Sequence, residues 1–599
     1  MPGIAGVFAT ASSPVHEQHV RRMVAQLDHR SDSESGLLAA PELGVHAGWV
    51  AHPGSFAARA SAASPGASTS IAFAGECFGA DDAPRERYVR DGDGFVSRLN
   101  GLFAGLLIDR ARRRVLLFND RFGSERLYTA EVEGATYFAS EAKALLAVLP
   151  ELRAFDDTGV AQWLAFGSTL GGTTLFRGIT LVPGGSLWRI GPGMPLRRER
   201  YFAPAEWEAL PALSEADFEA RLSETFGALL PAYLADARSV GLSLTGGLDT
   251  RMIAACLPHD REPAVAYTYA AEGDDQLLDL TIARRVAASR GIAHRALRVG
   301  ADFLADFAHH LDRTVWISDG CAGVLGAHEL PLTVQARALA PVRLTGNFGS
   351  EVLRSMSTFK RIGPGDELLS PDLAARVGAV VAEQQARRAH PVTYAAFEEV
   401  PWHLFGTLAV ARSQLVFRTP FMDNRVVELA YRAPAAARQS TAASLRLIHD
   451  HDAALAALPT DRGIAWGTAG FGARLRRLWA GATFKLDYWH KEGLPDRLTR
   501  FDPLLGALAP IGVLGLHKFL AYRGWFRGPL ARLAEQVFAD ARTHALPFWN
   551  QAALRRIACE HVEGHRNRLR EIHAVLTLEA VHRLLIDDSA YSNDSQAHA

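Results

Sequence analysis

The sequence is poor in lysine and in cysteine, and each shortage excludes a class of protein. Only five residues are lysines and the net charge is -1, so nothing in the composition favours binding to nucleic acid. The four cysteines are widely spaced and form no Cys-X-X-Cys pair. This argues against a zinc site or a disulfide framework, and it favours buried thiols in a reducing compartment.

Long apolar runs are also missing. The most apolar late stretch, 504–520, is interrupted by proline, glycine, histidine and lysine, so it is too broken to cross a bilayer. The first residues alternate like a buried strand and lack a secretory pattern. We therefore expect a cytoplasmic protein without a membrane partner.

What the chain does have is length, with 599 residues and 48% hydrophobic content, which allows two or more globular domains. Residues 1–203 contain short alternating strands separated by glycine, proline and aspartate turns. This pattern predicts an antiparallel β-sandwich with a few covering helices. A linker is expected at 204–213.

Helical and strand-like patterns alternate after the linker. They are a helix at 215–235, a strand at 240–242, a strand at 264–269 and a helix at 277–290. This order predicts a doubly wound parallel α/β domain over 214–588, which binds its ligand at the carboxyl ends of the strands. Helices dominate from about residue 370, and the polar tail 589–599 is expected to be disordered.

The most informative stretch is Ser-Leu-Thr-Gly-Gly-Leu-Asp-Thr-Arg at 243–251, between an apolar strand and a helical pattern. Two glycines let the backbone N–H groups approach phosphate oxygens at a helix N-terminus. Asp249 would repel phosphate unless Mg²⁺ lies between them, and no lysine follows as in a kinase-type loop. A simple Gly-Gly hairpin turn is the alternative. The residues expected to bind ATP or pyrophosphate here are Ser243, Leu244, Thr245, Gly246, Gly247, Leu248 and Thr250.

This stretch resembles the pyrophosphate loop of ATP pyrophosphatases, which activate carboxylates as acyl adenylates. Other segments, covering about the first 470 residues, resemble class B asparagine synthetases. They are Met-Pro-Gly-Ile-Ala-Gly at 1–6, Gly-Glu-Cys-Phe at 75–78, 119–128, 138–145, 178–185 and Arg-Thr-Pro-Phe-Met-Asp at 418–423. The resemblance implies an N-terminal glutaminase-like Ntn domain followed by an ATP pyrophosphatase domain.

The departures from that family concern the glutaminase site. The family's nucleophilic cysteine is Pro2 here, its oxyanion-hole asparagine is Ala74, and the aspartate that holds the glutamine ammonium is Asn100. Nucleophile, oxyanion donor and ammonium anchor have changed together. The first domain should therefore not hydrolyse glutamine, and a packed scaffold is its expected role.

The resemblance also implies positions for the nucleotide. It places the adenine beside the strand that contains Tyr267 and Thr268, with a carboxylate nearby at Asp279. Asp279 could equally be a solvated helix residue.

A second acidic loop of the family is matched loosely by Thr-Gly-Asn-Phe-Gly-Ser-Glu at 345–351, which contains Gly346. Asn347 and Ser350 replace the family's catalytic glutamate and metal-binding aspartate, whereas Glu351 keeps its charge. Asp249 and Glu351 are therefore the expected Mg²⁺ ligands. The alternative is that Glu351 only caps a helix.

The family's active-site lysine is missing from the segment 458–464, although Arg462 is present. Acyl-adenylate chemistry needs a fixed cation near the α-phosphate and the tetrahedral oxyanion. Arg462 is the first candidate, and Lys485 or Lys491 are outside candidates. Ordinary surface charge is the alternative for each.

Together these features predict an ATP-dependent C–N ligase that forms an acyl adenylate with Mg²⁺. The family's lasso-peptide macrolactam synthetases and β-lactam synthetases have also lost glutaminase chemistry. We favour a lasso-peptide cyclase, in which a peptide N-terminus attacks an adenylated Asp or Glu side chain, with a leader peptidase as a possible partner. The alternatives are an amidotransferase that uses free ammonia or an external glutaminase on a small molecule or saccharide, and an inactive scaffold. The helical stretch 471–588 could shape a wide cavity or only buttress the domain.

Overall fold

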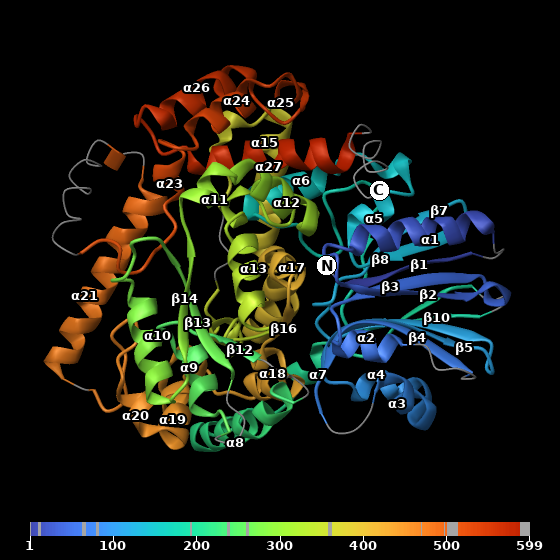
Figure 1. The fold of residues 1–599 in the computed structure, drawn as a ribbon, viewed down its shortest axis with the longest axis horizontal. Helices are drawn as coiled ribbons and strands as arrows, with labels where there is room; N and C mark the ends of the chain where they lie inside the picture. The colour runs from blue at the N-terminus through green and yellow to red at the C-terminus, as the bar shows by residue number, and fades with distance from the viewer. Residues whose placement is uncertain are drawn as a thin grey trace.

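Two antiparallel sheets form the N-terminal part of the computed structural model (Figure 1). The structure describes residues 2–9, 13–62, 68–79, 83–191, 195–235, 240–258, 263–357, 362–387, 389–468, 470–495, 498–499 and 513–587. The predicted tail 589–599 lies outside them.

The first sheet has the order β2(Glu34–Ala40), β3(Val45–Ala51), β1(Gly3–Phe8), β8(Ala135–Ala139), β7(Tyr128–Val132) and β9(Thr180–Leu181). The second sheet has the order β11(Arg197–Arg200), β10(Ser186–Ile190), β6(Arg114–Asn119), β5(Gly101–Asp109) and β4(Thr69–Cys77). Ile4 and Phe8 of β1 pack with Phe73 and Phe118 of the second sheet, whereas Val7 packs with the covering helix α1(Pro14–Leu27). The alternation expected from the sequence thus produces the predicted sandwich.

The expected linker is a packed segment. It contains the short helix α7(Ala205–Glu208), and Trp207 is buried with its ring centroid 4.5 Å from that of Phe202. The prediction of an open linker missed this because Trp207 buries its apolar ring against partners on both sides of the boundary. The expectation of buried thiols holds for Cys256 but is wrong for Cys559, which is exposed, and for Cys77 and Cys321, which are half-buried.

A five-stranded sheet with every strand parallel forms the second part, as predicted. Its order is β14(His294–Val299), β13(Val265–Ala271), β12(Val240–Ser243), β15(Val342–Thr345) and β16(Val416–Arg418). One face packs against α8(Glu215–Tyr233), α9(Leu248–Ala255) and α10(Leu278–Ser289), and the other against α12(Phe307–Ser318) and α13(Glu329–Leu339). This doubly wound arrangement brings the carboxyl ends of all five strands to one edge.

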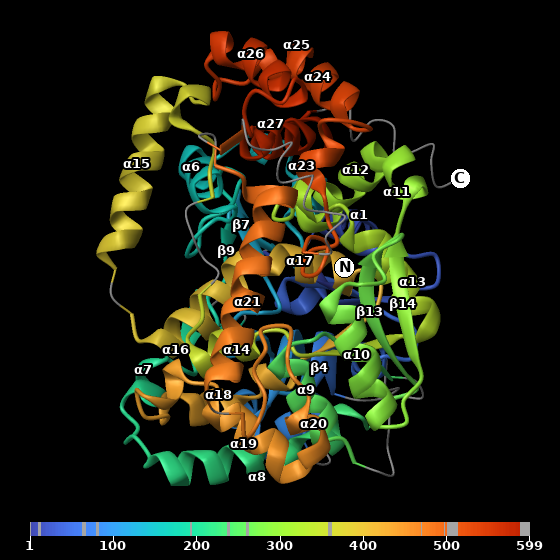
Figure 2. The ribbon, with the colours of Figure 1, turned by 90° about the vertical axis from the view of Figure 1, so that its left-hand side faces the viewer.

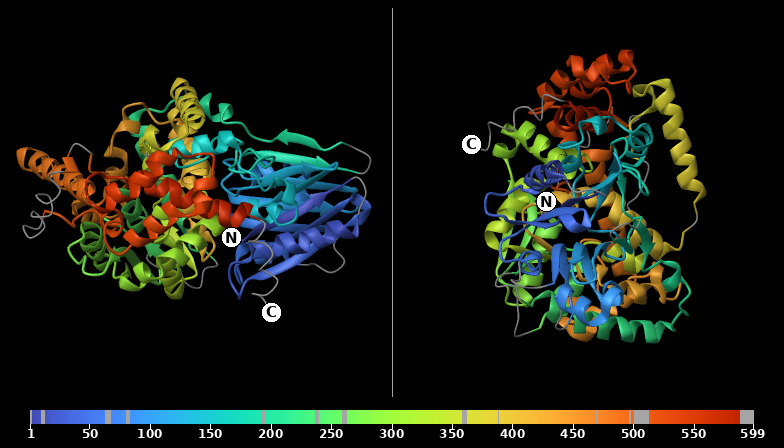
Figure 3. Two further views of the ribbon diagram at one scale, coloured as in Figure 1. Left: turned by 90° about the horizontal axis from the view of Figure 1, so that it is seen from above. Right: turned by 90° about the vertical axis from the view of Figure 1, so that its right-hand side faces the viewer.

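Helices make up the C-terminal part. They include α21(Phe471–Tyr488), the π-helix η9(Trp489–Gly493), α24(Ala531–Ala539), α26(Gln551–Val562) and α27(Leu569–Val581). Figures 2 and 3 show α24, α26 and α27, coloured red, gathered at one end of the molecule. Residues of α27 share a core with Trp163 and Phe176 of the N-terminal part. Within the described residues, no helix has both the length and the apolar character that crossing a bilayer requires.

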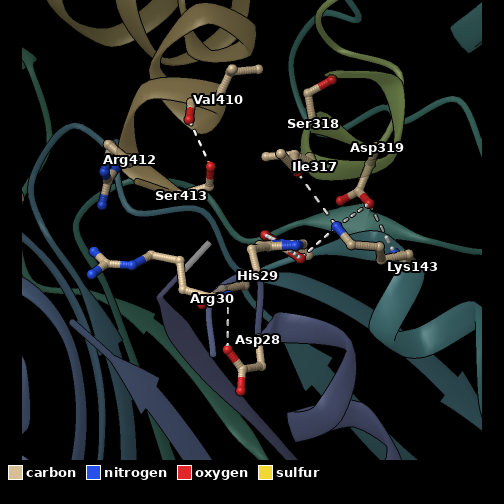
Figure 4. A network of polar contacts seen from close by, with 12 residues as sticks. Asp28, His29, Arg30, Lys143, Ile317, Ser318, Asp319, Val410, Arg412 and Ser413 are labelled. Atoms are coloured by element: carbon tan, nitrogen blue, oxygen red, sulfur yellow. Dashed lines mark hydrogen bonds and ion pairs between the residues drawn. The ribbon is translucent and has the colours of Figure 1, made fainter. Parts of the chain in front are cut away.

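Buried ion pairs join the two parts. Lys143 is fully buried, and its Nζ lies 2.5 Å from Glu141 Oε2 and 3.2 Å from Asp319 Oδ1, at the end of α12 (Figure 4). Burial lowers the pKa of Lys143 to about 8. Across the same interface, Arg418 of β16 donates two hydrogen bonds of 2.7 Å to the carboxylate of Glu76 on β4. The N-terminal part is therefore fixed to the parallel sheet by ion pairs that are buried or nearly so.

Candidate active site

The glycine-rich loop lies at the carboxyl end of β12, between two strands that hold it. Leu244 N donates to Tyr267 O at 2.8 Å, and Thr268 Oγ1 donates to Leu244 O at 2.7 Å. Ser243 and Leu248 are buried, and Ser243 Oγ accepts from Arg343 at 3.3 Å. The surface that a nucleotide can reach is therefore the middle of the loop.

The amides of this loop are bound within the protein. Gly246 N donates to Asp279 Oδ1 at 2.8 Å, Gly247 N to Thr245 Oγ1 at 3.3 Å, and Thr245 N to Thr250 Oγ1 at 3.3 Å. Gly247 precedes α9 and offers no capping side chain, so the first turn of α9 keeps N–H groups for an anion.

Asp279 is half-buried beside the loop. Burial, and then the neighbouring carboxylate of Asp461, raise the pKa of Asp279 to about 6. The charges of Arg462 and Lys518 act in the opposite direction, so both cations lie close to this end of the loop. A half-buried carboxylate that accepts a hydrogen bond from the loop differs from a solvated helix residue.

Asp249 is paired with an arginine that the sequence analysis did not consider. Arg354, at the end of α14(Gly349–Arg354), lies 2.8 Å from Asp249 Oδ1 and donates to Oδ2 at 2.9 Å. Ser350 Oγ also donates to Asp249 Oδ2, at 2.8 Å. The serine in the position of the family's metal-binding aspartate thus helps to hold the carboxylate that remains.

Glu351 lies close to Asp249 and Glu399. Burial, followed by repulsion from these two carboxylates, raises the pKa of Glu351 to about 7. Asp249 Oδ1 is buried and lies 2.8 Å from Arg354 in an ion pair that lacks hydrogen-bond geometry. The crowding of Asp249 and Glu351 fits Mg²⁺, which takes oxygen ligands and relieves such repulsion, and Arg354 would share Asp249 with the metal. Among the described residues, no group of three or more metal-binding side chains is present.

The second loop packs directly on Asp249 and Thr250. A Cβ at Gly346 would lie 2.6 Å from Thr250 N, and a Cβ at Gly349 would lie 2.6 Å from Asp249 Cγ. Only glycine allows so close an approach. Asn347 is fixed in turn, because Thr419 Oγ1 donates to its carbonyl oxygen at 2.7 Å.

The three predicted cations differ in their surroundings. Arg462 lies 3.2 Å from Asp461 and stacks 3.4 Å from the ring centre of Phe484. Lys485 of α21 lies 5.0 Å from the ring centre of Trp489 of η9. Lys491 lies 3.6 Å from Asp274. Only Arg462 is adjacent to a residue that contacts the loop, since Asp461 N donates to Gly246 O at 3.2 Å.

Arg354 and Lys518 are the residues that sequence reasoning missed. Arg354 follows Ser350 by four residues on one helix, which was a usable signal. Lys518 lies in the C-terminal extension and reaches the site only through the tertiary fold, so no local pattern marks it.

A cavity of about 1100 Å³ lies at the α12–α13 connection, lined by parts of the chain far apart in sequence. Its lining includes Cys321, His328 and Glu329 from that connection, Glu492 from η9, and His573 from α27. The C-terminal helices therefore shape a wide cavity as well as extending the core.

The positions of the family's glutaminase site line a small cavity at Pro2 and a larger one, of about 500 Å³, at Asn100. Pro2 lines a cavity of only about 50 Å³ together with Gly75, Glu125 and Arg412. Asn100 donates to Asp423 Oδ2 at 2.8 Å and accepts from Asn424 N at 2.9 Å. The side chain in the position of the glutamine-ammonium anchor now joins the two parts of the protein.

Comparisons with known proteins agree with this division of the chain. Residues 86–201 match the family profile "Glutamine amidotransferase domain", and residues 226–401 match "Asparagine synthase". A candidate glutamine-hydrolysing asparagine synthetase of Mycobacterium tuberculosis is 29% identical over 232 residues, 37% of this chain and 34% of that protein. Glutamine-hydrolysing asparagine synthetase 1 of Bacillus subtilis is 25% identical over 228 residues, with the same coverage of 37% and 34%. The chain thus spans about a third of the length of the curated relatives it matches.

Among solved structures, a glutamine phosphoribosylpyrophosphate amidotransferase from B. subtilis, complexed with ADP and GMP, is similar at 13% identity. It covers 49% of this chain and 65% of that chain, with a TM-score of 0.24.

Proposed function

Because this chain belongs to the asparagine synthetase family, we propose that it is an ATP-dependent ligase that forms an amide bond through an acyl adenylate. A carboxylate oxygen of the substrate bonds to the α-phosphorus of ATP, the α–β phosphoanhydride bond breaks, and pyrophosphate leaves. An amine then attacks the activated carbonyl carbon, the bond to AMP breaks, and the amine loses a proton to solvent.

The chain's own residues support the first step. The first-turn N–H groups of α9 can donate hydrogen bonds to the departing pyrophosphate and stabilise its negative charge. Asp249 and Glu351 are the residues that would hold Mg²⁺, which offsets the charge of the pyrophosphate when it is bound.

We further propose that the substrate is a peptide and the product a macrolactam of the lasso-peptide type, made by attack of the peptide's own N-terminus on an Asp or Glu side chain. The single observation that carries this proposal is the cavity of about 1100 Å³, far larger than a free amino acid needs. Loss of the glutaminase nucleophile at Pro2 agrees with an amine that comes from the substrate. A leader peptidase that exposes this amine is the partner we propose.

Exchange of labelled pyrophosphate into ATP tests the proposal, with Mg²⁺ and either free aspartate or synthetic acidic peptides. We expect exchange only with peptides, followed by loss of one water from the peptide in its mass spectrum. Exchange with aspartate alone would favour an ammonia-dependent amidotransferase, and exchange with neither would favour a scaffold.

Asp249→Asn should reduce the exchange at least about 100-fold, because a lost metal ligand removes several kcal/mol of stabilisation from the transition state. Asp302→Asn, on the exposed start of α11(Ala301–Ala305), is the matched control and should keep the exchange rate. An active Asp249→Asn enzyme would contradict the proposed metal site.

A further inference from the structure

The segment that carries Lys518 lies between the glycine-rich loop and the large cavity. On the loop side, Leu516 O accepts from Leu278 N at 2.7 Å, one residue before Asp279. Asp279 in turn accepts from Gly246 N. On the cavity side, Leu520 and Tyr522 belong to the cavity lining.

This segment is rigidly held. Asp487 of α21 is fully buried and accepts backbone hydrogen bonds from Gly515 at 2.9 Å, His517 at 2.7 Å and Lys518 at 3.1 Å. Lys491 Nζ donates to the carbonyl oxygen of Lys518 at 2.5 Å. A buried carboxylate that binds three amides within four residues fixes the backbone from which the lysine side chain extends.

Lys518 has a carboxylate partner that belongs to the cavity. Its Nζ lies 3.5 Å from Glu492 Oε2, and the two side chains are 33% and 26% exposed. Glu492 lines the cavity. The positive charge of Lys518 also acts on His328 of the cavity lining and on Asp279 of α10, which accepts a hydrogen bond from the loop. This ion pair therefore links the segment that contacts α10 beside Asp279 to a residue of the cavity lining.

We infer that Lys518 binds the acidic side chain of the peptide substrate at this junction, and that Glu492 occupies the same position when no substrate is present. The inference rests on the proposed function and names the residue that receives the reacting carboxylate. A peptide carboxylate replaces Glu492 on the ammonium group, and the displaced Glu492 carboxylate, which is 26% exposed, returns to solvent. The lysine thus selects peptides with an acidic side chain.

The test uses the whole chain and the acidic peptide that supports the fastest pyrophosphate exchange with the unaltered enzyme. Lys518→Met should raise the KM for this peptide roughly 10–100-fold, because losing one hydrogen bond to a charged group weakens binding by that factor. The KM for ATP should change less than about twofold. Lys518→Arg keeps the charge and should restore most of the affinity. Arg532→Met, which removes an exposed charge of the same extension outside the cavity lining, is the control and should behave as the unaltered enzyme.

Glu492→Gln separates substrate binding from a structural role. If Glu492 competes with the substrate, Glu492→Gln should lower the peptide KM about 3–10-fold, because a neutral amide is a weaker partner for lysine. If the pair only supports the fold, Glu492→Gln and Lys518→Met should raise the KM together.

That joint rise, or a peptide KM unchanged by Lys518→Met, would overturn the role of Lys518 and leave the proposed function standing. Absence of exchange with every peptide in the unaltered enzyme would overturn the proposed function, and the inference with it. Thermal unfolding of each variant, followed by circular dichroism, shows whether a loss of affinity comes from a loss of fold.

Discussion

At the scale of one residue, the ionised Glu351 carboxylate that would bind Mg²⁺ also destabilises the metal-free folded protein. Its pKa in the folded protein is raised to about 7, from 4.5, by burial and by nearby carboxylates. The folded state therefore binds more protons than the unfolded state between these two values, so the stability that Glu351 contributes is present below pH 4.5 and is lost as the pH rises through 7. A bound Mg²⁺ would remove this penalty.

Glu351→Gln should accordingly make the metal-free protein more stable at pH 8, by about 2 kcal/mol after allowing for partial exposure, and no more stable at pH 4.5. The same substitution should lower the pyrophosphate exchange. Thermal unfolding between pH 4.5 and 8 without Mg²⁺ or ATP checks the first part. Parallel pH profiles for the two proteins would contradict the raised pKa.

At the scale of elements, the close contact between α14 and the start of α9 controls where Asp249 lies. A methyl group at Gly349 would meet Asp249 Cγ at 2.6 Å, so the carboxylate must move. Gly349→Ala should reduce the exchange at least about tenfold, since a displacement of 1 Å in a catalytic group costs that much or more.

The matched control is Gly378→Ala on α15(Pro371–Ala386), where a Cβ meets nothing within 4 Å. It should leave activity unchanged and stabilise the protein by about 0.5–1 kcal/mol. Equal exchange rates for the two alanine variants would show that the contact between α14 and α9 has no role.

The elements themselves were largely predictable from sequence. The strand at 240–242, the two glycines and the helix after them depend on contacts within a few residues, and the structure has all three. The sandwich and the parallel sheet followed from periodicity in the same way. The pair formed by Asp249 and Arg354, 105 residues apart, depends on the tertiary fold. That the loop residues bind a nucleotide stays a prediction.

At the scale of the whole molecule, Asn100, which stands where the family has its ammonium-binding aspartate, contributes to the contact between the two domains we propose. Asn100 donates to Asp423, which is fully buried. Restoring the family's aspartate by Asn100→Asp would place a second carboxylate at hydrogen-bond distance from the first, and Arg425, which already binds Asp423, offsets their repulsion only in part.

Asn100→Asp should therefore destabilise the protein by about 2–4 kcal/mol near neutral pH, and less at pH 4. Asn100→Ala, which loses the hydrogen bonds without adding a charge, should cost about 1–2 kcal/mol at either pH. Thermal unfolding at the two pH values checks this. The idea would be abandoned if the aspartate variant were as stable as the alanine variant at pH 7.

Pro2→Cys should not produce ammonia from glutamine, because Ala74 and Asn100 still lack the oxyanion donor and the ammonium anchor. A coupled assay for released ammonia measures this directly. Hydrolysis by the single variant would mean that the remaining pocket still recognises glutamine.

The buried pair of Lys143 and Asp319 bears on the order in which the protein is made. The two residues are 176 positions apart, so at roughly 5–20 residues per second the ribosome needs about 9–35 s to supply the aspartate after the lysine. Until then the ammonium group of Lys143 is paired with Glu141 but not with Asp319. The carboxylate of Asp319 also accepts hydrogen bonds from the amides of Ala142 and Lys143, so these amides lack their partner as well. The nascent N-terminal half therefore cannot reach its final packing alone, and its completion waits for the synthesis of α12.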